Sequence, residues 1–129
     1  MTSLARKLGI GPGQEVAVVG QPAGYVQALE PLPPGVRVTR RMRRGLDIVQ
    51  VFCTSKSELE RRFPEATSSV KTDGAVWVSW PKRSSKLPTD LTDRTVREAG
   101  LEAGLVDVKV CSVDETWSGL KFVRRTADR

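Results

Sequence analysis

Three short segments of almost continuous apolar character constrain the fold of this chain more than any other feature. They run through residues 15–19, 47–53 and 75–80, and turn-forming residues bound each of them. Such short apolar runs are typical of strands that are buried on both faces of a parallel sheet. The chain between them is long enough for helical crossovers, so the sequence predicts βαβ units.

The end of the chain follows a different pattern. Residues 105–113 alternate along a strand, and residues 117–123 form a final strand. The few residues between them, around Asp114-Glu115-Thr116, are enough for a hairpin and too few for a helical crossover. We therefore predict an α/β fold, a three-layer sandwich with a mostly parallel sheet and a C-terminal antiparallel hairpin.

Local signals place the other elements. Ser55 with Glu58 has the spacing of a capping box and predicts a helix start. Pro22 is expected in the first turn of a preceding helix, and Pro64 is expected to bend or break the helix that Ser55 begins. The dipeptide Asp73-Gly74 is expected to turn the chain into the third apolar strand.

The length of 129 residues predicts one α/β domain over residues 1–129, with a charged and frayed tail at 124–129. No apolar run is long enough to cross a bilayer, so no membrane association is expected. Arg6, Lys7 and Glu15 interrupt the region that a signal peptide would keep apolar. We expect a cytoplasmic protein.

The sequence contains no histidine and two cysteines, Cys53 and Cys111. Without histidine, Ser-His and Cys-His nucleophile pairs and the common zinc sites are excluded. Both cysteines lie in strand-like runs and are interpreted as buried thiols, with a reactive Cys53 as the sharper alternative. We predict no metal and no catalytic residue.

The carboxyl edge of the predicted sheet is the candidate ligand site, because open α/β sheets bind ligands at that edge where the strand order reverses. The turn Gly20–Gly24 follows the first strand, and its helix start is expected to offer backbone N–H groups to an anion. The basic loop 82–86 follows the third apolar strand, and its cations suit phosphate or carboxylate. The candidate ligand-binding residues are Gly20, Gln21, Gly24, Tyr25, Thr54, Ser55, Lys82, Ser84 and Ser85.

A dense basic stretch is the second candidate surface, in a chain of formal net charge +6. Its residues are Arg37, Arg40, Arg41, Arg43 and Arg44. It has two interpretations: a nucleic-acid footprint, or a solvated edge strand protected by its charges. If the strand at 36–38 is parallel to its neighbours, these arginines join the ligand edge, and in a hairpin they point to the opposite edge.

Two resemblances add to this interpretation. The runs Leu4–Gly13, Asp73–Lys82, Thr89–Thr92, Gly104–Cys111 and Trp117–Phe122 resemble a small bacterial family catalogued as a domain of unknown function. That resemblance implies no functional residue.

The order of elements is similar to class I S-adenosylmethionine-dependent methyltransferases, which implies a truncated, Rossmann-like version of that fold. In such enzymes a Gly-rich turn after the first strand holds the cofactor, and an acidic residue ends the second strand and binds the ribose hydroxyls. Here Gly20–Gly24 stands at the first position and the basic Thr39-Arg40-Arg41 at the second. S-adenosylmethionine or a nucleotide is therefore a candidate ligand, outside the usual binding mode.

The sequence thus predicts a non-catalytic module that binds a small anionic or nucleotide-like ligand at the switch-point crevice. Two alternatives stay open. One is nucleic-acid or protein interaction through residues 37–44, and the other is a degenerate S-adenosylmethionine-dependent methyltransferase.

Overall fold

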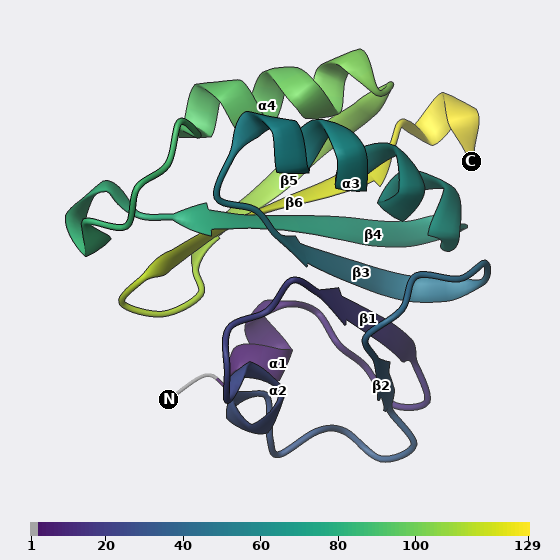
Figure 1. Ribbon diagram of the computed structural model, residues 1–129. Coiled ribbons are helices and arrows are strands. Elements are labelled where there is room, and N and C mark those ends of the chain that lie inside the picture. Colours follow the sequence, from purple (N-terminus) through teal and green to yellow (C-terminus); the bar gives the residue numbers. More distant parts are fainter. Residues whose placement is uncertain (1–2) are drawn as a thin grey trace.

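The computed structural model describes residues 3–129, and within them six strands form one mixed sheet between two layers of helices (Figure 1). Residues 1 and 2 of the predicted domain lie outside the described residues. The strands are β1 Glu15–Val19, β2 Arg37–Thr39, β3 Leu46–Phe52, β4 Val70–Pro81, β5 Leu105–Ser112 and β6 Trp117–Arg124. The helices are α1 Leu4–Lys7, α2 Tyr25–Ala28, α3 Lys56–Ser69 and α4 Asp93–Glu102, with 3₁₀ turns at Arg83–Ser85 and Thr126–Asp128.

The strand order is β2-β1-β3-β4-β6-β5, so the sheet reverses its direction of growth between β1 and β3. Strands β2, β1, β3 and β4 are parallel, β6 is antiparallel to β4, and β5 pairs antiparallel with β6. The predicted fold class is confirmed, including the C-terminal hairpin. The direction of the strand at 36–38, which the sequence left open, is parallel to β1.

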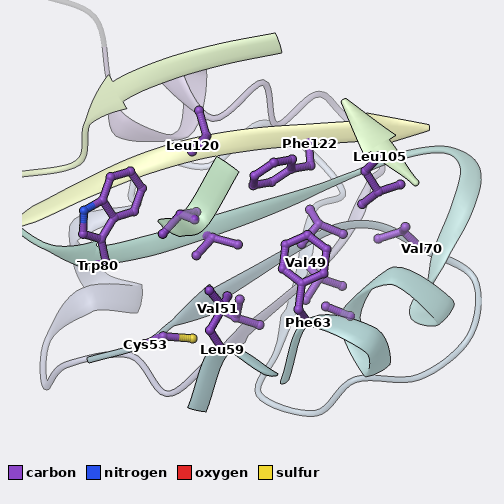
Figure 2. Packing of buried hydrophobic residues seen from close by; sticks show 14 of the residues in the cluster. Val49, Val51, Cys53, Leu59, Phe63, Val70, Trp80, Leu105, Leu120 and Phe122 are labelled. Atoms are coloured by element: carbon purple, nitrogen blue, oxygen red, sulfur yellow. The ribbon is translucent and has the colours of Figure 1, made fainter. Parts of the chain in front are cut away.

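Each face of the sheet has its own hydrophobic core. Helices α3 and α4 cover one face and α1 and α2 the other (Figure 1). On the first face Leu59 and Phe63 of α3 pack over Val49 and Val51 of β3 (Figure 2). On the second face a buried Trp77 donates its indole N–H to the Leu8 carbonyl (3.0 Å), which fixes the end of α1 on the sheet.

Three local predictions are wrong. Pro22 precedes α2 instead of lying in it, because the turn continues to Gly24, whose φ of +81° is left-handed. The break expected at Pro64 does not occur, because Pro64 lies inside α3, which runs to Ser69. Asp73-Gly74 is part of β4 and makes no turn. A Cβ at Gly74 would lie 2.8 Å from the Asp47 carbonyl oxygen. Glycine at this position therefore allows β3 and β4 to approach each other closely.

The packing of α4 on β6 yields a stability prediction. A Cβ at Gly100 would lie 2.0 Å from Cε1 of the buried Phe122, whose ring packs edge-on against Phe63. Gly100→Ala normally favours a helix, but here the overlap forces α4 away from the sheet. We expect a loss of about 1–3 kcal/mol in the free energy of unfolding, measured by urea denaturation.

Glu102→Ala, on an exposed position of the same helix, is the control and should change stability by less than about 0.5 kcal/mol. A Gly100→Ala variant as stable as the parent would contradict this packing.

Candidate functional site

The carboxyl ends of four parallel strands meet at one edge of the sheet. Gly20 follows β1, Arg40 follows β2, Cys53 follows β3 and Lys82 follows β4. The parallel pairing of β2 with β1 therefore brings Arg40 and its neighbour to the predicted ligand edge. The question is which of the candidate side chains there are free to meet a ligand.

The Gly20–Gly24 turn is compact. With its amide nitrogen toward the strand, the Gln21 side chain donates to the Val18 carbonyl (3.2 Å) and accepts from Arg40 Nε (3.3 Å). A cavity of about 130 Å³ lies beside the turn, between Gln21, Gly24 and Arg40. Helix α2 has four residues, and the Tyr25 N–H that would begin its anion site donates to the Pro22 carbonyl. So short a helix carries only a small dipole, and the turn by itself does not form the anion site that the sequence suggested.

Tyr25 points into the protein and not toward the edge. Its hydroxyl donates to Gln50 Oε1 (2.7 Å), and Gln50 Nε2 donates to Ser79 Oγ (3.0 Å). Gln50 is 1% exposed, and burial raises the pKa of Tyr25. These three residues form a satisfied buried network that fixes α2 on the sheet, which accounts for Tyr25 without a ligand.

Thr54 and Ser55 serve the start of α3. Ser55 Oγ accepts from the Glu58 N–H (3.2 Å), as the capping box predicted. The Glu58 carboxylate reaches back to Thr54, accepting from its N–H (2.9 Å) and its hydroxyl (2.7 Å). These bonds, the backbone one first, lower the pKa of Glu58 below its usual value. Both predicted hydroxyls are therefore engaged within the protein.

The loop after β4 lies apart from the glycine turn. Lys82 Nζ donates to Ser112 Oγ on β5, and Ser85 Oγ donates to the Lys82 carbonyl. Ser84 lies in the exposed 3₁₀ turn. The cavity beside Gly24 contains no residue of this loop, so the structure does not gather the two predicted halves into one site.

Four arginines instead surround a cavity of about 390 Å³ at the same edge, which we call the arginine pocket. Arg40 and Arg41 come from the chain after β2, and Arg61 and Arg62 from α3. The complete lining is Val19, Arg40, Arg41, Met42, Arg61, Arg62 and Glu65. The lining therefore includes four arginines and one glutamate, a balance of charge that favours an anion.

Arg62 connects this pocket to the point where the strand order reverses. Its Nη1 donates to the carbonyl of Phe52 at the end of β3, and its Nη2 lies 3.4 Å from Glu58 Oε2. Arg61 and Arg62 were not among the predicted site residues. The one sequence signal was the spacing of four residues between Glu58 and Arg62 on the predicted helix, which indicates an ion pair but no pocket.

The other three arginines of the basic stretch, Arg37, Arg43 and Arg44, do not line the arginine pocket. Arg43 forms an ion pair with Glu15 (3.1 Å), the first residue of β1, and therefore lies toward the amino edge. Arg37 begins β2 and is exposed, and Arg44 is exposed in the loop before β3. The stretch is thus divided between two edges and forms no single basic surface.

The cysteines offer no activated nucleophile at this edge. Both are free; Cys53 is buried, and burial raises its pKa to about 11. Cys111 is half-buried, and burial also raises its pKa. Within residues 3–129 no three potential ligands among Cys, Asp and Glu gather to hold a metal ion.

The strand order and the C-terminal hairpin define a truncated, Rossmann-like fold of the class I methyltransferase type. Within that class, the chain belongs to the family described as protein of unknown function (DUF3052), whose model matches residues 43–126. No curated protein matches its sequence.

Solved structures share the fold at low sequence identity. A possible exported protein from Bordetella parapertussis aligns with a TM-score of 0.65 and 16% identity, over 95% of this chain and 65% of that one, just under two thirds. An S-adenosylmethionine-dependent methyltransferase from Aquifex aeolicus aligns with a TM-score of 0.66 and 14% identity, over 92% and 86%. Magnesium protoporphyrin IX methyltransferase from Synechocystis PCC 6803, with bound S-adenosylmethionine, aligns at 0.60 and 11%, over 88% and 71%.

The residues present do not fit S-adenosylmethionine in the mode that the resemblance implies. Arg40 follows β2 where an acidic ribose ligand is expected. The Arg62 guanidinium lies against the glycine turn, since a Cβ at Gly20 would come 2.6 Å from Arg62 Nη1. The cavity beside the turn, about 130 Å³, is also below the roughly 300–1,000 Å³ usual for such ligands.

No helix in residues 3–129 combines the length and the apolar character needed to cross a membrane.

The role of Glu58 can be tested by pH. Its carboxylate accepts two hydrogen bonds from Thr54, and its pKa is lowered in the folded protein. The stabilisation is therefore complete above the unfolded pKa of about 4.3 and is lost as the pH falls through the lower folded pKa. We expect Glu58→Gln to reduce the free energy of unfolding at pH 7 and to have little effect at pH 2–3.

Urea denaturation across this pH range measures the difference, with Glu60→Gln on the exposed side of α3 as the control. A Glu58→Gln effect that is equal at pH 7 and pH 2.5 would contradict a role for the charge.

Proposed function

We propose that this protein is a non-catalytic module that binds a small, phosphate-bearing anion, such as a nucleotide or pyrophosphate, in the arginine pocket. The observation that carries the proposal is the convergence of Arg40, Arg41, Arg61 and Arg62 on one cavity of about 390 Å³. The cavity lies within the size range of small-ligand pockets. It also lies at the switch point, where α/β sheets bind ligands.

Two of these guanidinium groups are available for an incoming anion. Among residues 3–129, the side chains of Arg41 and Arg61 have no hydrogen-bond or ion-pair partner, whereas Arg62 is held by Phe52 and Glu58. Arg62 thus acts as a fixed cation in the wall. Arg41 and Arg61 supply guanidinium groups that can form bidentate hydrogen bonds to phosphate oxygens. Glu65 is the one acidic residue of the lining, so the four arginines leave the lining with a net positive charge.

Binding is favoured over catalysis by the state of the neighbouring groups. Thr54 and Ser55 use their hydroxyls in the start of α3. The Cys53 thiol is buried, with a pKa of about 11, so it is protonated at neutral pH. These observations support a module that holds a ligand without attacking it. Covalent modification of Cys53 or Thr54 during incubation with a nucleotide would count against this part of the proposal.

Two wider expectations belong to the same proposal. Residues 1–129 act as one domain, and the protein works in the cytoplasm, where free thiols such as Cys53 and Cys111 persist. Fractionation of the native host's cells would test the location.

The proposal predicts binding of inorganic pyrophosphate and of ATP to the protein, measured by isothermal titration calorimetry at low salt. Hydrogen bonds between charged groups contribute about 1.5–3 kcal/mol. We therefore expect Arg41→Ser and Arg61→Ser each to weaken binding by at least about tenfold. Arg44→Ser, which removes the same charge outside the pocket lining, is the matched control and should change the affinity less than about threefold.

Three other binding results would overturn the proposal. If single-stranded or duplex nucleic acid binds and Arg37→Ser and Arg44→Ser weaken it as much as Arg41→Ser does, the basic stretch acts as an extended surface. If S-adenosylmethionine binds and the phosphate compounds do not, the methyltransferase alternative is favoured. If none of these compounds binds at millimolar concentration, the pocket has no such ligand.

A further inference from the structure

A second cavity, of about 590 Å³, opens at the carboxyl end of β4 and at the start of α4. It shares no lining residue with the arginine pocket. Its walls are the complete set Trp80, Pro81, Arg83, Leu87, Thr89, Leu91, Thr92, Asp93 and Arg94. We call it the Trp80 cavity.

The floor of this cavity holds a hydrogen-bond donor without a partner. Trp80 is 5% exposed, yet its indole N–H has no acceptor among residues 3–129. Every fully buried side-chain nitrogen and oxygen in this part of the chain does have a partner, so the Trp80 nitrogen must reach an accessible surface. Figure 2 shows that this nitrogen points away from Leu120 and Val51, and the cavity is the surface that Trp80 lines.

Comparison with Trp77 shows why this donor is informative. The Trp77 N–H is buried and donates to the Leu8 carbonyl (3.0 Å). Buried indole N–H groups usually find such a partner. The Trp80 N–H has no partner among residues 3–129 and reaches the surface of the cavity, where it is available to an acceptor that enters.

The rim of the cavity supplies further donors. Thr92 caps α4 through its side chain and carbonyl, which bond to the N–H groups of Thr95 and Val96. The first N–H groups of this ten-residue helix, those of Asp93 and Arg94, have no acceptor within residues 3–129. The start of α4 therefore favours negative charge.

The charged side chains near the start of α4 also affect how well the cavity can hold a negative charge. The Asp93 carboxylate accepts from Arg97 Nε (2.6 Å), which offsets part of its charge, because the same guanidinium also pairs with Asp107. Arg83 is exposed and forms no ion pair in the described part of the chain. Pro81, Leu87 and Leu91 add apolar side chains to the lining of the cavity.

We propose that the Trp80 cavity binds a small carboxylic acid with an apolar body and a second oxygen acceptor, that is, an oxo- or hydroxy-substituted aromatic or branched aliphatic acid. The second oxygen accepts from the Trp80 N–H at the floor. The apolar body lies against Leu87 and Leu91, and the carboxylate meets Arg83 and the first turn of α4. This site is independent of the arginine pocket.

Phenylpyruvate is the probe, because it combines a ring, an oxo group and a carboxylate. In ¹⁵N NMR spectra the three indole N–H signals, of Trp77, Trp80 and Trp117, are followed during the titration. We expect a saturable downfield shift of the Trp80 signal, which Trp80→Phe assigns by its disappearance. 3-Phenylpropionate, which lacks the oxo group, should bind at least about tenfold more weakly, and 3-phenyl-1-propanol should not bind measurably.

Arg83→Ala is a surface change that leaves the fold intact, and it should weaken phenylpyruvate binding at least about fivefold. Lys86→Ala, in the same loop but outside the lining, is its matched control and should leave the affinity unchanged. The proposal is overturned if the Trp80 signal does not shift at millimolar phenylpyruvate, or if Arg83→Ala and Lys86→Ala bind equally well. Pyrophosphate binding plays no part in this outcome, so the two proposed sites succeed or fail separately.

Discussion

The parallel pairing of β2 with β1 decides where the positive charge of this protein lies. In this register Glu15, Val16 and Ala17 pair with Arg37, Val38 and Thr39, so the chain leaves β2 at the carboxyl edge of the sheet. Arg40 and Arg41 then lie opposite the first turns of α3, which starts from the same edge. The loop returns to the amino edge, where Arg43 pairs with Glu15. Had β2 formed a hairpin with β3, the four guanidinium groups of the arginine pocket would not have met.

The fold of this protein resembles that of methyltransferases, but the residues at the carboxyl edge of its sheet do not fit the methyltransferase cofactor. The fold is a truncated version of the class I methyltransferase type, and the glycine turn after β1 is present. The edge around this turn is nevertheless basic. Arg40 follows β2 and bonds to Gln21, and Arg62 lies against Gly20 and holds the end of β3. A scaffold shared at 14% identity therefore presents a different set of groups at its ligand edge, and function has to be argued from those groups.

The sequence predicted the elements whose patterns are local. The apolar runs at 15–19 and 47–53 and the short link before β6 were enough for the α/β class and the hairpin. The direction of β2 was not predictable, because a strand of three residues has the same pattern in a hairpin and in a parallel pair. Asp73-Gly74 was assigned to a turn on composition, but the close approach of β3 and β4 requires Gly74 within the strand. Arg61 and Arg62 were not predicted because only the tertiary position of α3 brings them to the loop after β2. The contact of Lys82 with Ser112 was not predictable either, because the two residues are distant in sequence.

The central claim is that the four arginines act together as one anion site. Arginine side-chain Nε–H signals, recorded by ¹⁵N NMR during titration with inorganic pyrophosphate, test it most directly. The account predicts saturable shifts with one common dissociation constant for Arg40, Arg41, Arg61 and Arg62, while the exposed Arg44 and Arg125 stay unchanged. Equal, non-saturating shifts of all these arginines, or no shift at all, would contradict it.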